Sequence, residues 1–192
     1  MKIGLPVRTK RLLLREFREG DWKDVNRYAP DPKVVEFLPW GPNTAEQTRE
    51  FIAKAIGEQR AVPRDSFNLA IALRGSGRVV GGIRLGIRSV KHRRGDIGYV
   101  LARDCWGKGY ATEAARAIVA FGFTGLNLHR IYATCDVRNK ASARVLEKAG
   151  MKREGRLRES AWLKGRWRDS LIYGVLEQDW RKAAGRGGGR GR

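Results

Sequence analysis

A strand-helix-strand unit in the middle of the chain constrains the fold more than any other feature. A short β-rich segment, Ile97–Leu101, leads into CWGKGYATEAARAIVAFGF, where apolar residues from Ala111 to Phe121 recur at helical spacing. The segment Arg130–Cys135 is again apolar and β-branched, as expected of a strand. A helix of about 13 residues between two short strands predicts a parallel strand pair joined by a right-handed crossover.

The segments around this unit predict antiparallel strands and further helices. A β-rich segment at 68–73 is followed by Gly75-Ser76-Gly77 and a second β-rich segment at 79–87, which indicates a hairpin. Further strands are expected over 11–17, 152–162 and 168–176, and helices over 21–28, 44–58 and 139–149. We therefore predict one α+β domain over residues 1–180, with a mixed, mostly antiparallel sheet of about seven strands, a central parallel βαβ unit and helices on both faces.

Composition excludes several classes of protein. With 192 residues and 42% apolar residues, the chain is large enough to bury a core and is not wholly disordered. Its longest uncharged stretch, Ala117–Leu128, is shorter than the roughly 18 apolar residues of a membrane helix. The N-terminus lacks the apolar block of a secretory signal, so we expect a cytoplasmic protein without membrane association. Two cysteines and two histidines, spread along the chain, predict neither a disulfide framework nor a metal site.

The charge balance is strongly positive. Forty Lys and Arg against 20 Asp and Glu give a formal net charge of +20. The end of the chain, 181–192, carries five cations and no anion, and its Arg/Gly-rich composition predicts a disordered tail. Such a surface attracts polyanions such as RNA and repels small polycations. A solvated surface with no partner explains the charge equally well.

The loop Trp106-Gly107-Lys108-Gly109-Tyr110-Ala111 stands where a predicted strand ends and a predicted helix begins. This arrangement aims free backbone N–H groups and the positive end of the helix dipole at an anion. Gly107 and Gly109 permit a tight turn and a close approach to phosphate oxygens. The loop matches neither the P-loop nor the GxGxxG dinucleotide motif, and a plain tight connection would look the same.

Longer segments carry a more specific signal than the loop alone. DIGYVLARDCWGKGYATEAARAIVAFGF and HRIYATCDVRNKASARVLEKAGMKREGRLRES resemble the cofactor-binding region of the GNAT (general N-acetyltransferase) superfamily. The opening TKRLLLREFREGDW and the closing WLKGRWRDSLIYGVLEQDW resemble its ribosomal-protein N-terminal acetyltransferase branch, so the similarity extends over residues 8–180. The resemblance implies a GNAT-like fold that takes acetyl-CoA as co-substrate and needs no metal.

The same resemblance implies which residues bind acetyl-CoA. The loop amides would hold its diphosphate, the backbone at the end of the preceding strand would pair with the pantetheine arm like an added strand, and an asparagine with a nearby serine would contact the arm. Trp106 stands where the family has Gln or Arg. The implied residues are Leu101, Ala102, Gly107, Lys108, Gly109, Tyr110, Ala111, Thr112, Asn139 and Ser142.

Acetyl transfer to an amine requires a neutral nitrogen, a polarised thioester carbonyl and a proton for the departing thiolate. An α-amine with a pKa of about 7.8 costs only ~1 kcal/mol to deprotonate at pH 7, whereas a lysine costs ~4.6 kcal/mol. Asp96 and Glu159 are the candidate bases, and a backbone N–H near Leu101 is the candidate oxyanion donor. Many GNAT enzymes have a tyrosine that acts as the general acid where this chain has Leu146, so Ser142 is the candidate acid here. Salt bridges would equally explain the carboxylates, and cofactor contact would explain the serine.

These observations favour an N-acetyltransferase that acts by direct attack on a protein or peptide α-amine, such as that of a ribosomal protein presented on RNA. A small-molecule amine acetyltransferase is one alternative. A ribosome- or nucleic-acid-associated binding protein with a vestigial cofactor pocket is the other. Trp40, Trp162 and Trp167 are candidates for lining the acceptor groove. The choice between monomer and homodimer stays open.

Overall fold

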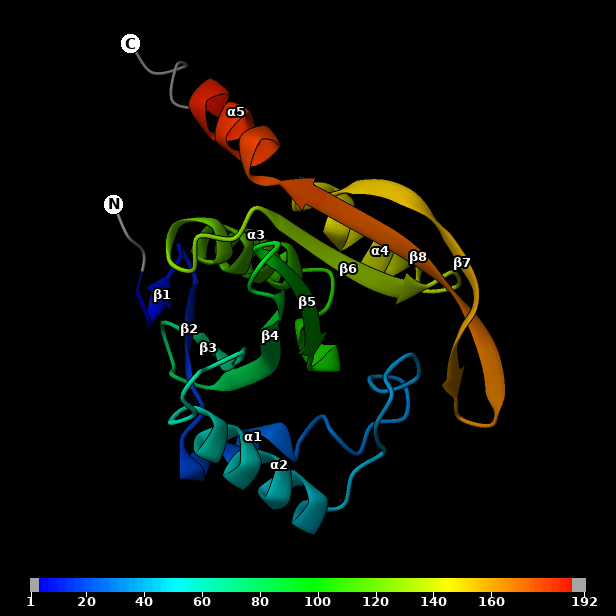
Figure 1. The fold of residues 1–192 in the computed structure, drawn as a ribbon. Coiled ribbons are helices and arrows are strands. Elements are labelled where there is room, and N and C mark those ends of the chain that lie inside the picture. The colour runs from blue at the N-terminus through cyan, green and yellow to red at the C-terminus, as the bar shows by residue number, and fades with distance from the viewer. Residues whose placement is uncertain (1–3, 188–192) are drawn as a thin grey trace.

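An eight-stranded sheet forms the centre of the computed structural model, which describes residues 4–187 (Figure 1). The strand order is β1-β2-β3-β4-β5-β6-β8-β7, and within the described residues β5 and β6 are the one parallel pair. The mixed α+β fold with its central parallel unit is therefore confirmed. The strands are β1 (Val7–Arg8), β2 (Leu12–Glu16), β3 (Ser66–Leu73), β4 (Val79–Ser89), β5 (Arg94–Leu101), β6 (Arg130–Asp136), β7 (Lys152–Leu163) and β8 (Arg166–Leu176).

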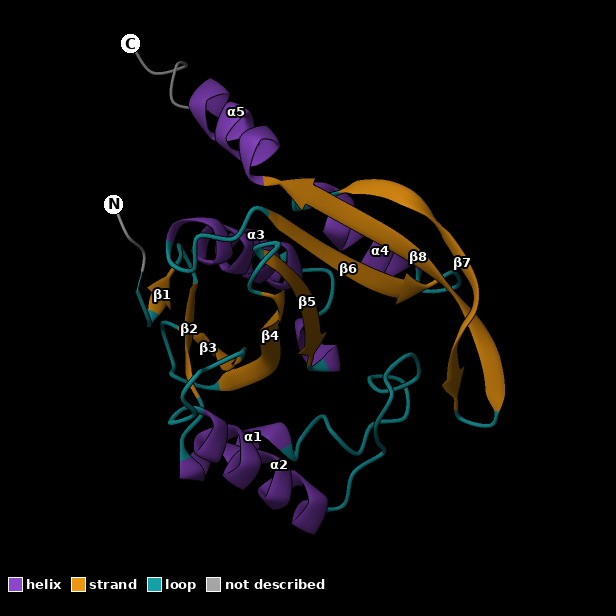
Figure 2. Cartoon of the chain, viewed as in Figure 1, coloured by secondary structure: helices purple, strands orange, loops and turns teal. Residues whose placement is uncertain are grey.

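Helices cover both faces of the sheet, as expected. The helices are α1 (Trp22–Val25), α2 (Ala45–Glu58), α3 (Tyr110–Thr124), α4 (Lys140–Lys148) and α5 (Glu177–Gly187), with 3-10 turns at Glu19–Asp21 and Arg103–Cys105. The larger core lies between the sheet and α3 with α4, and a smaller core lies under α1 and α2 on the opposite face. Figure 2 shows α1 and α2 at the bottom of the view and the β7–β8 hairpin extending beyond the other strands.

The parallel pair is short, and this positions the functional site. β5 and β6 pair with each other only from Arg94↔Arg130 to Asp96↔Tyr132. Beyond this point β5 continues to Leu101 paired only with β4, and β6 continues to Asp136 paired only with β8. The two strands therefore separate toward their C-terminal ends. We call the resulting gap the splay. Helix α3 lies close to β6, because a Cβ at Gly122 would come within 2.6 Å of the Ile131 side chain.

Three elements differ from the sequence prediction. The two-residue β1 adds an eighth strand, which is too short to give a pattern in the sequence. The helix expected over 21–28 is a 3-10 turn followed by the short α1, because the Asp21 carboxylate binds Arg15 and the Arg18 N–H instead of capping a longer helix.

The third difference concerns the tail predicted from residue 181. Residues 181–187 are helical and continue α5, which is supported by an Arg181–Glu177 ion pair and by Trp180 packing on Phe123. Residues 188–192 lie outside the described part of the chain. No helix among residues 4–187 is long and apolar enough to span a membrane.

Candidate active site

The glycine loop between β5 and α3 has the geometry of an anion site. Gly107 and Gly109 have φ values of +73° and +77°, and an added Cβ at Gly107 would meet open space. Gly109 is the N-cap of α3 and has no side chain to satisfy the first N–H groups of the helix. The amides of the first turn therefore face outward with the positive end of the helix dipole behind them.

Several hydrogen bonds hold this loop against the turn between β1 and β2. The Glu113 carboxylate accepts from the Thr9 hydroxyl at 2.6 Å, the Arg11 N–H at 2.8 Å and the Arg11 Nε at 2.7 Å. Arg11 also donates from Nη1 to the Lys108 carbonyl at 2.9 Å and lies over the Tyr110 ring. Burial raises the pKa of Glu113, but these hydrogen bonds outweigh it and lower the pKa. The turn between β1 and β2 thus fixes the loop.

Cations surround the space beside the loop. A cavity of about 630 Å³ opens next to Gly109 and Thr112. Its wall carries four basic side chains, which are Arg8, Arg11, Arg116 and Lys148. This environment favours a ligand that carries phosphate groups, because the basic side chains and the helix dipole act in the same sense.

The backbone of β5 offers hydrogen-bonding groups to the splay. The Ala102 N–H binds the Val80 carbonyl at 2.8 Å, so alternation along the strand turns the Leu101 N–H away from β4 and toward the splay. The Leu101 carbonyl accepts from the Trp106 indole at 3.0 Å. The Ala102 carbonyl accepts from Cys105 N–H, so both backbone groups of Ala102 are occupied. Leu101 therefore offers a free N–H toward the splay, whereas Ala102 can offer only the second lone pair of its carbonyl oxygen.

Ser142 lies where α4 faces the splay and is held by hydrogen bonds to Asn139 and Tyr99. Its N–H donates to the Asn139 side chain at 3.0 Å, and its hydroxyl lies 2.9 Å from the Tyr99 hydroxyl of β5. Cys135, at the end of β6, is buried in the core that α4 covers, and burial raises the pKa of its thiol. Burial also raises the pKa of the Tyr99 phenol, and the hydrogen bond to Ser142 offsets part of this. The Tyr99 phenol is therefore neutral at pH 7, and it holds the serine hydroxyl at the splay.

Asn139 caps α4 and is also a candidate contact for acetyl-CoA, so its replacement separates two effects. Asn139→Ala is expected to destabilise the protein by about 1 kcal/mol, as loss of an N-cap does. It should also weaken acetyl-CoA binding severalfold. Thr44→Ala is the matched control, because the Thr44 side chain caps α2 by accepting from the Gln47 N–H. It should lower the free energy of unfolding by a similar amount and leave the acetyl-CoA affinity unchanged. Denaturant unfolding and calorimetric titration measure the two effects. Equal affinities in both variants would limit Asn139 to capping.

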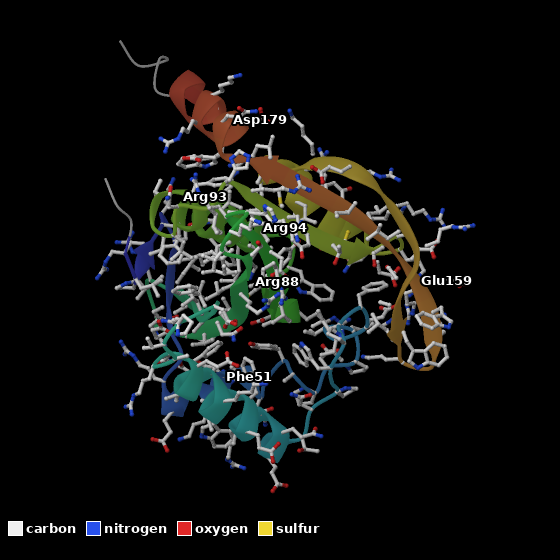
Figure 3. The ribbon with its side chains drawn as sticks, viewed as in Figure 1. Phe51, Arg88, Arg93, Arg94, Glu159 and Asp179 are labelled. Carbon is white, nitrogen blue, oxygen red and sulfur yellow. The ribbon has the colours of Figure 1, made fainter. Side chains whose placement is uncertain are left out.

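The two candidate bases lie in different places. Asp96 is at the start of the splay, where its carboxylate accepts from Arg84 at 2.5 Å and from Arg88 at 2.6 Å. Glu159 lies at an irregular point of β7, with an exposed side chain and φ of +46°. Figure 3 shows it on the outer hairpin, apart from the Arg88 that binds Asp96. The structure does not bring the two carboxylates together, and it removes Glu159 from the splay because the hairpin carries it outward.

An open space lies on the α1–α2 face of β5. A Cβ added at Gly98 would meet no atom within 4 Å, although Gly98 is paired with Arg84 of β4. The β7–β8 hairpin reaches this side, because Lys164 Nζ donates to the Val35 carbonyl in the α1–α2 loop at 2.7 Å. Trp162 and Trp167 form an edge-to-face pair on the hairpin and are more than half exposed. Trp40 packs on the core under α1 and α2, in the loop region that the hairpin reaches at Val35.

Cys105 beside the loop is a buried thiol. Burial raises its pKa, and Arg78 donates to its sulfur. It is therefore a poor nucleophile. Among the described residues, no group of three or more His, Cys, Asp or Glu is arranged to hold a metal ion.

Two side chains of this site have no signal in the sequence. Arg11 reaches the loop from more than 90 residues away, and Tyr99 reads as an ordinary strand residue beside Leu101. Only the folded sheet brings them to the loop and to Ser142.

Comparison with known proteins agrees with this geometry. Residues 11–152 match the family model described as an acetyltransferase (GNAT) domain. The chain is 37% identical over 174 residues to the uncharacterized N-acetyltransferase YnaD of Bacillus subtilis, covering 91% of this chain and 98% of YnaD. A GNAT-family acetyltransferase structure from Bacillus anthracis superposes with a TM-score of 0.80 at 36% identity, covering 90% of this chain and 98% of the other.

Two further relatives have names that specify an acceptor. The Bacillus subtilis protein YdaF, provisionally named a ribosomal N-acetyltransferase, is 30% identical over 75% of this chain and 77% of its own length. Escherichia coli spermidine N(1)-acetyltransferase is 32% identical over 46% of this chain and 48% of its own length. The relatives thus agree on the reaction and differ in the acceptor.

Proposed function

Because this chain belongs to the GNAT family of acetyl-CoA-dependent N-acetyltransferases, we propose that its acceptor is the N-terminal α-amine of a protein or peptide. The observation that carries the proposal is the open space at Gly98, which adjoins the splay on the face opposite Ser142. Gly98 has no side chain to fill this space, which suits the end of a chain, and Asp96 beside it is bound by two arginines and is not free to select a polycation.

The residues proposed to bind acetyl-CoA fit the group. The outward amides from Lys108 to Thr112 and the cations beside them suit a diphosphate, and the Leu101 N–H is aimed into the splay. Acetyl-CoA supplies the activated acetyl thioester. A backbone N–H of β5 at the splay then serves as the oxyanion donor for its carbonyl.

The proton steps follow from the groups at the splay. An α-amine needs only about 1 kcal/mol to reach its neutral form at pH 7, so a weak base acting through water suffices. Asp96 keeps this role in the proposal because it lies at the start of the splay, whereas Glu159 does not, because it lies on the outer hairpin. On the other side, Ser142 donates a proton to the departing sulfur, and Tyr99 holds its hydroxyl in position.

The acceptor class is tested by mass spectrometry. Incubation with acetyl-CoA and a mixture of short peptides, spermidine and free lysine should add 42 Da to peptide α-amines at pH 7, because the mass of one acetyl group replaces one hydrogen. Ribosomal proteins form a second arm, since an acceptor presented on RNA suits the net charge of +20. Acetylation confined to spermidine or to lysine side chains would contradict the proposal.

A further inference from the structure

We propose that an arginine pair, the half-exposed Arg138 and the buried Arg168, binds a carboxylate of the acceptor, so that the enzyme prefers amines with a negative charge near the reacting nitrogen. The inference deepens the proposed function and rests on it. It concerns a cluster at the end of β6 that neither acetyl-CoA binding nor the proton steps use.

Asp136 organises the cluster. Its carboxylate accepts from the Arg138 N–H at 2.9 Å, from Arg138 Nε at 3.0 Å and Nη2 at 2.8 Å, and from Arg168 Nη1 at 3.0 Å. The side chains of Asp136 and Arg168 are only 3% and 7% exposed, whereas Arg138 is 41% exposed. Four donors thus occupy the Asp136 carboxylate, which leaves it unable to bind a cationic acceptor.

The cluster lies across the sheet from Ser142. Cys135 and Asp136 are consecutive on β6, where successive side chains point to opposite faces. Cys135 packs in the core on the α4 side, together with Leu146 of α4, so Asp136 points to the α1–α2 side. Consistent with this, Arg138 lies 5.4 Å from the ring centre of Phe37 in the loop between α1 and α2. Asp136 ends β6 in the part of the strand that has separated from β5, so the cluster borders the splay on its α1–α2 side.

The cluster carries more positive than negative charge. Two guanidinium groups share one buried carboxylate, and the nearby Glu36 is exposed, where water screens its charge. Within the described part of the chain, Arg168 Nε is buried and has no hydrogen-bond partner. A buried donor without a partner is costly, so the cluster has one N–H group that still needs a hydrogen-bond acceptor.

A carboxylate fits these donors best, because a guanidinium presents paired N–H groups in a plane that matches it. Two sources carry such a group: an acidic side chain at the second position of a peptide, and the α-carboxylate of a free amino acid. Polyamines carry none, and they would face an arginine pair.

Matched acceptors test the inference. The probes are peptides that begin Ala-Glu, Ala-Gln or Ala-Lys and are otherwise identical, together with alanine and alaninamide. We expect kcat/KM for the Ala-Glu peptide to exceed that for Ala-Gln by about tenfold, the size of one charge-assisted hydrogen bond. Preference for alanine over alaninamide would identify the free α-carboxylate as the source instead. In Arg138→Gln either ratio should fall toward one, mainly through KM.

Arg144→Gln is the matched control, because Arg144 is an exposed arginine on α4 that pairs only loosely with Glu147. It should keep the wild-type ratio, and unchanged acetyl-CoA affinity in both variants would show that they fold. Equal rates for all probes in the wild type, or a preference for Ala-Lys, would overturn the inference.

A binding measurement separates failure of this inference from failure of the proposed function. The N-acetylated forms of the Ala-Glu and Ala-Gln peptides are titrated into the enzyme with CoA present, which requires no reaction. Tighter binding of the acidic form without turnover of any peptide would leave the anion site standing and refute the α-amine acceptor. Equal binding together with turnover would do the reverse.

Discussion

Gly109→Val should weaken acetyl-CoA binding by at least about 100-fold, which corresponds to roughly 3 kcal/mol. Gly109 has φ of +77°, a conformation that costs a residue with a Cβ about 1–2 kcal/mol and a β-branched residue more. Relief of this strain rotates the peptide groups next to it. The loop amides then lose their common direction, and each hydrogen bond to a charged group that is lost costs about 1.5–3 kcal/mol. Calorimetric titration with acetyl-CoA measures the effect.

Gly165→Val is the matched control. Gly165 has φ of +79° in the turn between β7 and β8, and an added Cβ there meets no atom within 4 Å. The backbone strain is therefore the same, but the turn is far along the chain from the loop. Acetyl-CoA affinity should stay within about twofold of the wild type, well inside 1 kcal/mol. If Gly109→Val bound acetyl-CoA as well as Gly165→Val does, the diphosphate site would not be at this loop.

Ser142→Ala should lower kcat by about 100-fold, the usual contribution of a positioned general acid. The substitution keeps the backbone N–H that binds Asn139, so α4 should remain capped and acetyl-CoA affinity should change little. Tyr99→Phe removes the hydroxyl that lies 2.9 Å from Ser142 and should have a smaller effect, about tenfold, because it only frees the serine to turn away. Steady-state kinetics with a saturating peptide acceptor measure both.

The pattern across the two variants distinguishes proton donation from cofactor contact. A role in binding alone predicts a higher KM for acetyl-CoA with kcat preserved in Ser142→Ala. The matched substitution Ser160→Ala removes a hydroxyl that binds Ser170 on the hairpin and should leave kcat for the reaction unchanged. A Tyr99→Phe enzyme with full kcat would remove Tyr99 from the proposed mechanism.

Local sequence was enough to predict the elements whose stability depends on their own pattern. Helix α3 is an example, because its apolar residues recur at helical spacing and Gly109 marks its start. The capping box of Thr44 and Gln47 likewise fixed the beginning of α2. Strand β1 and the last turns of α5 depend on tertiary contacts, such as Trp180 against Phe123, and gave no comparable signal.

The candidate site likewise contains residues that local sequence could locate and residues that only the folded sheet brings in. The glycine loop, Asn139 and Ser142 are adjacent in sequence to the helices that position them, so a family resemblance located them. The residues that hold them come from elsewhere: Arg11 reaches Lys108 across 97 positions, Tyr99 reaches Ser142 across 43, and Arg168 reaches Asp136 across 32. These contacts depend on sheet register, which no local pattern specifies. The outward position of Glu159 on the hairpin was missed for the same reason.

The brevity of the β5–β6 pairing has a thermodynamic consequence. The sheet consists of two groups of strands, β1–β5 and β6-β8-β7, which are joined along β5 and β6 by only three residue pairs. A molecule that binds between the separated ends of β5 and β6 supplies hydrogen bonds that the two strands do not make to each other. Because it binds only the folded chain, it raises the free energy of unfolding by about 2.7 kcal/mol when present at 100 times its Kd. The melting temperature should therefore climb with acetyl-CoA concentration, and starvation for the acetyl donor would shorten the lifetime of the enzyme as well as slow its turnover.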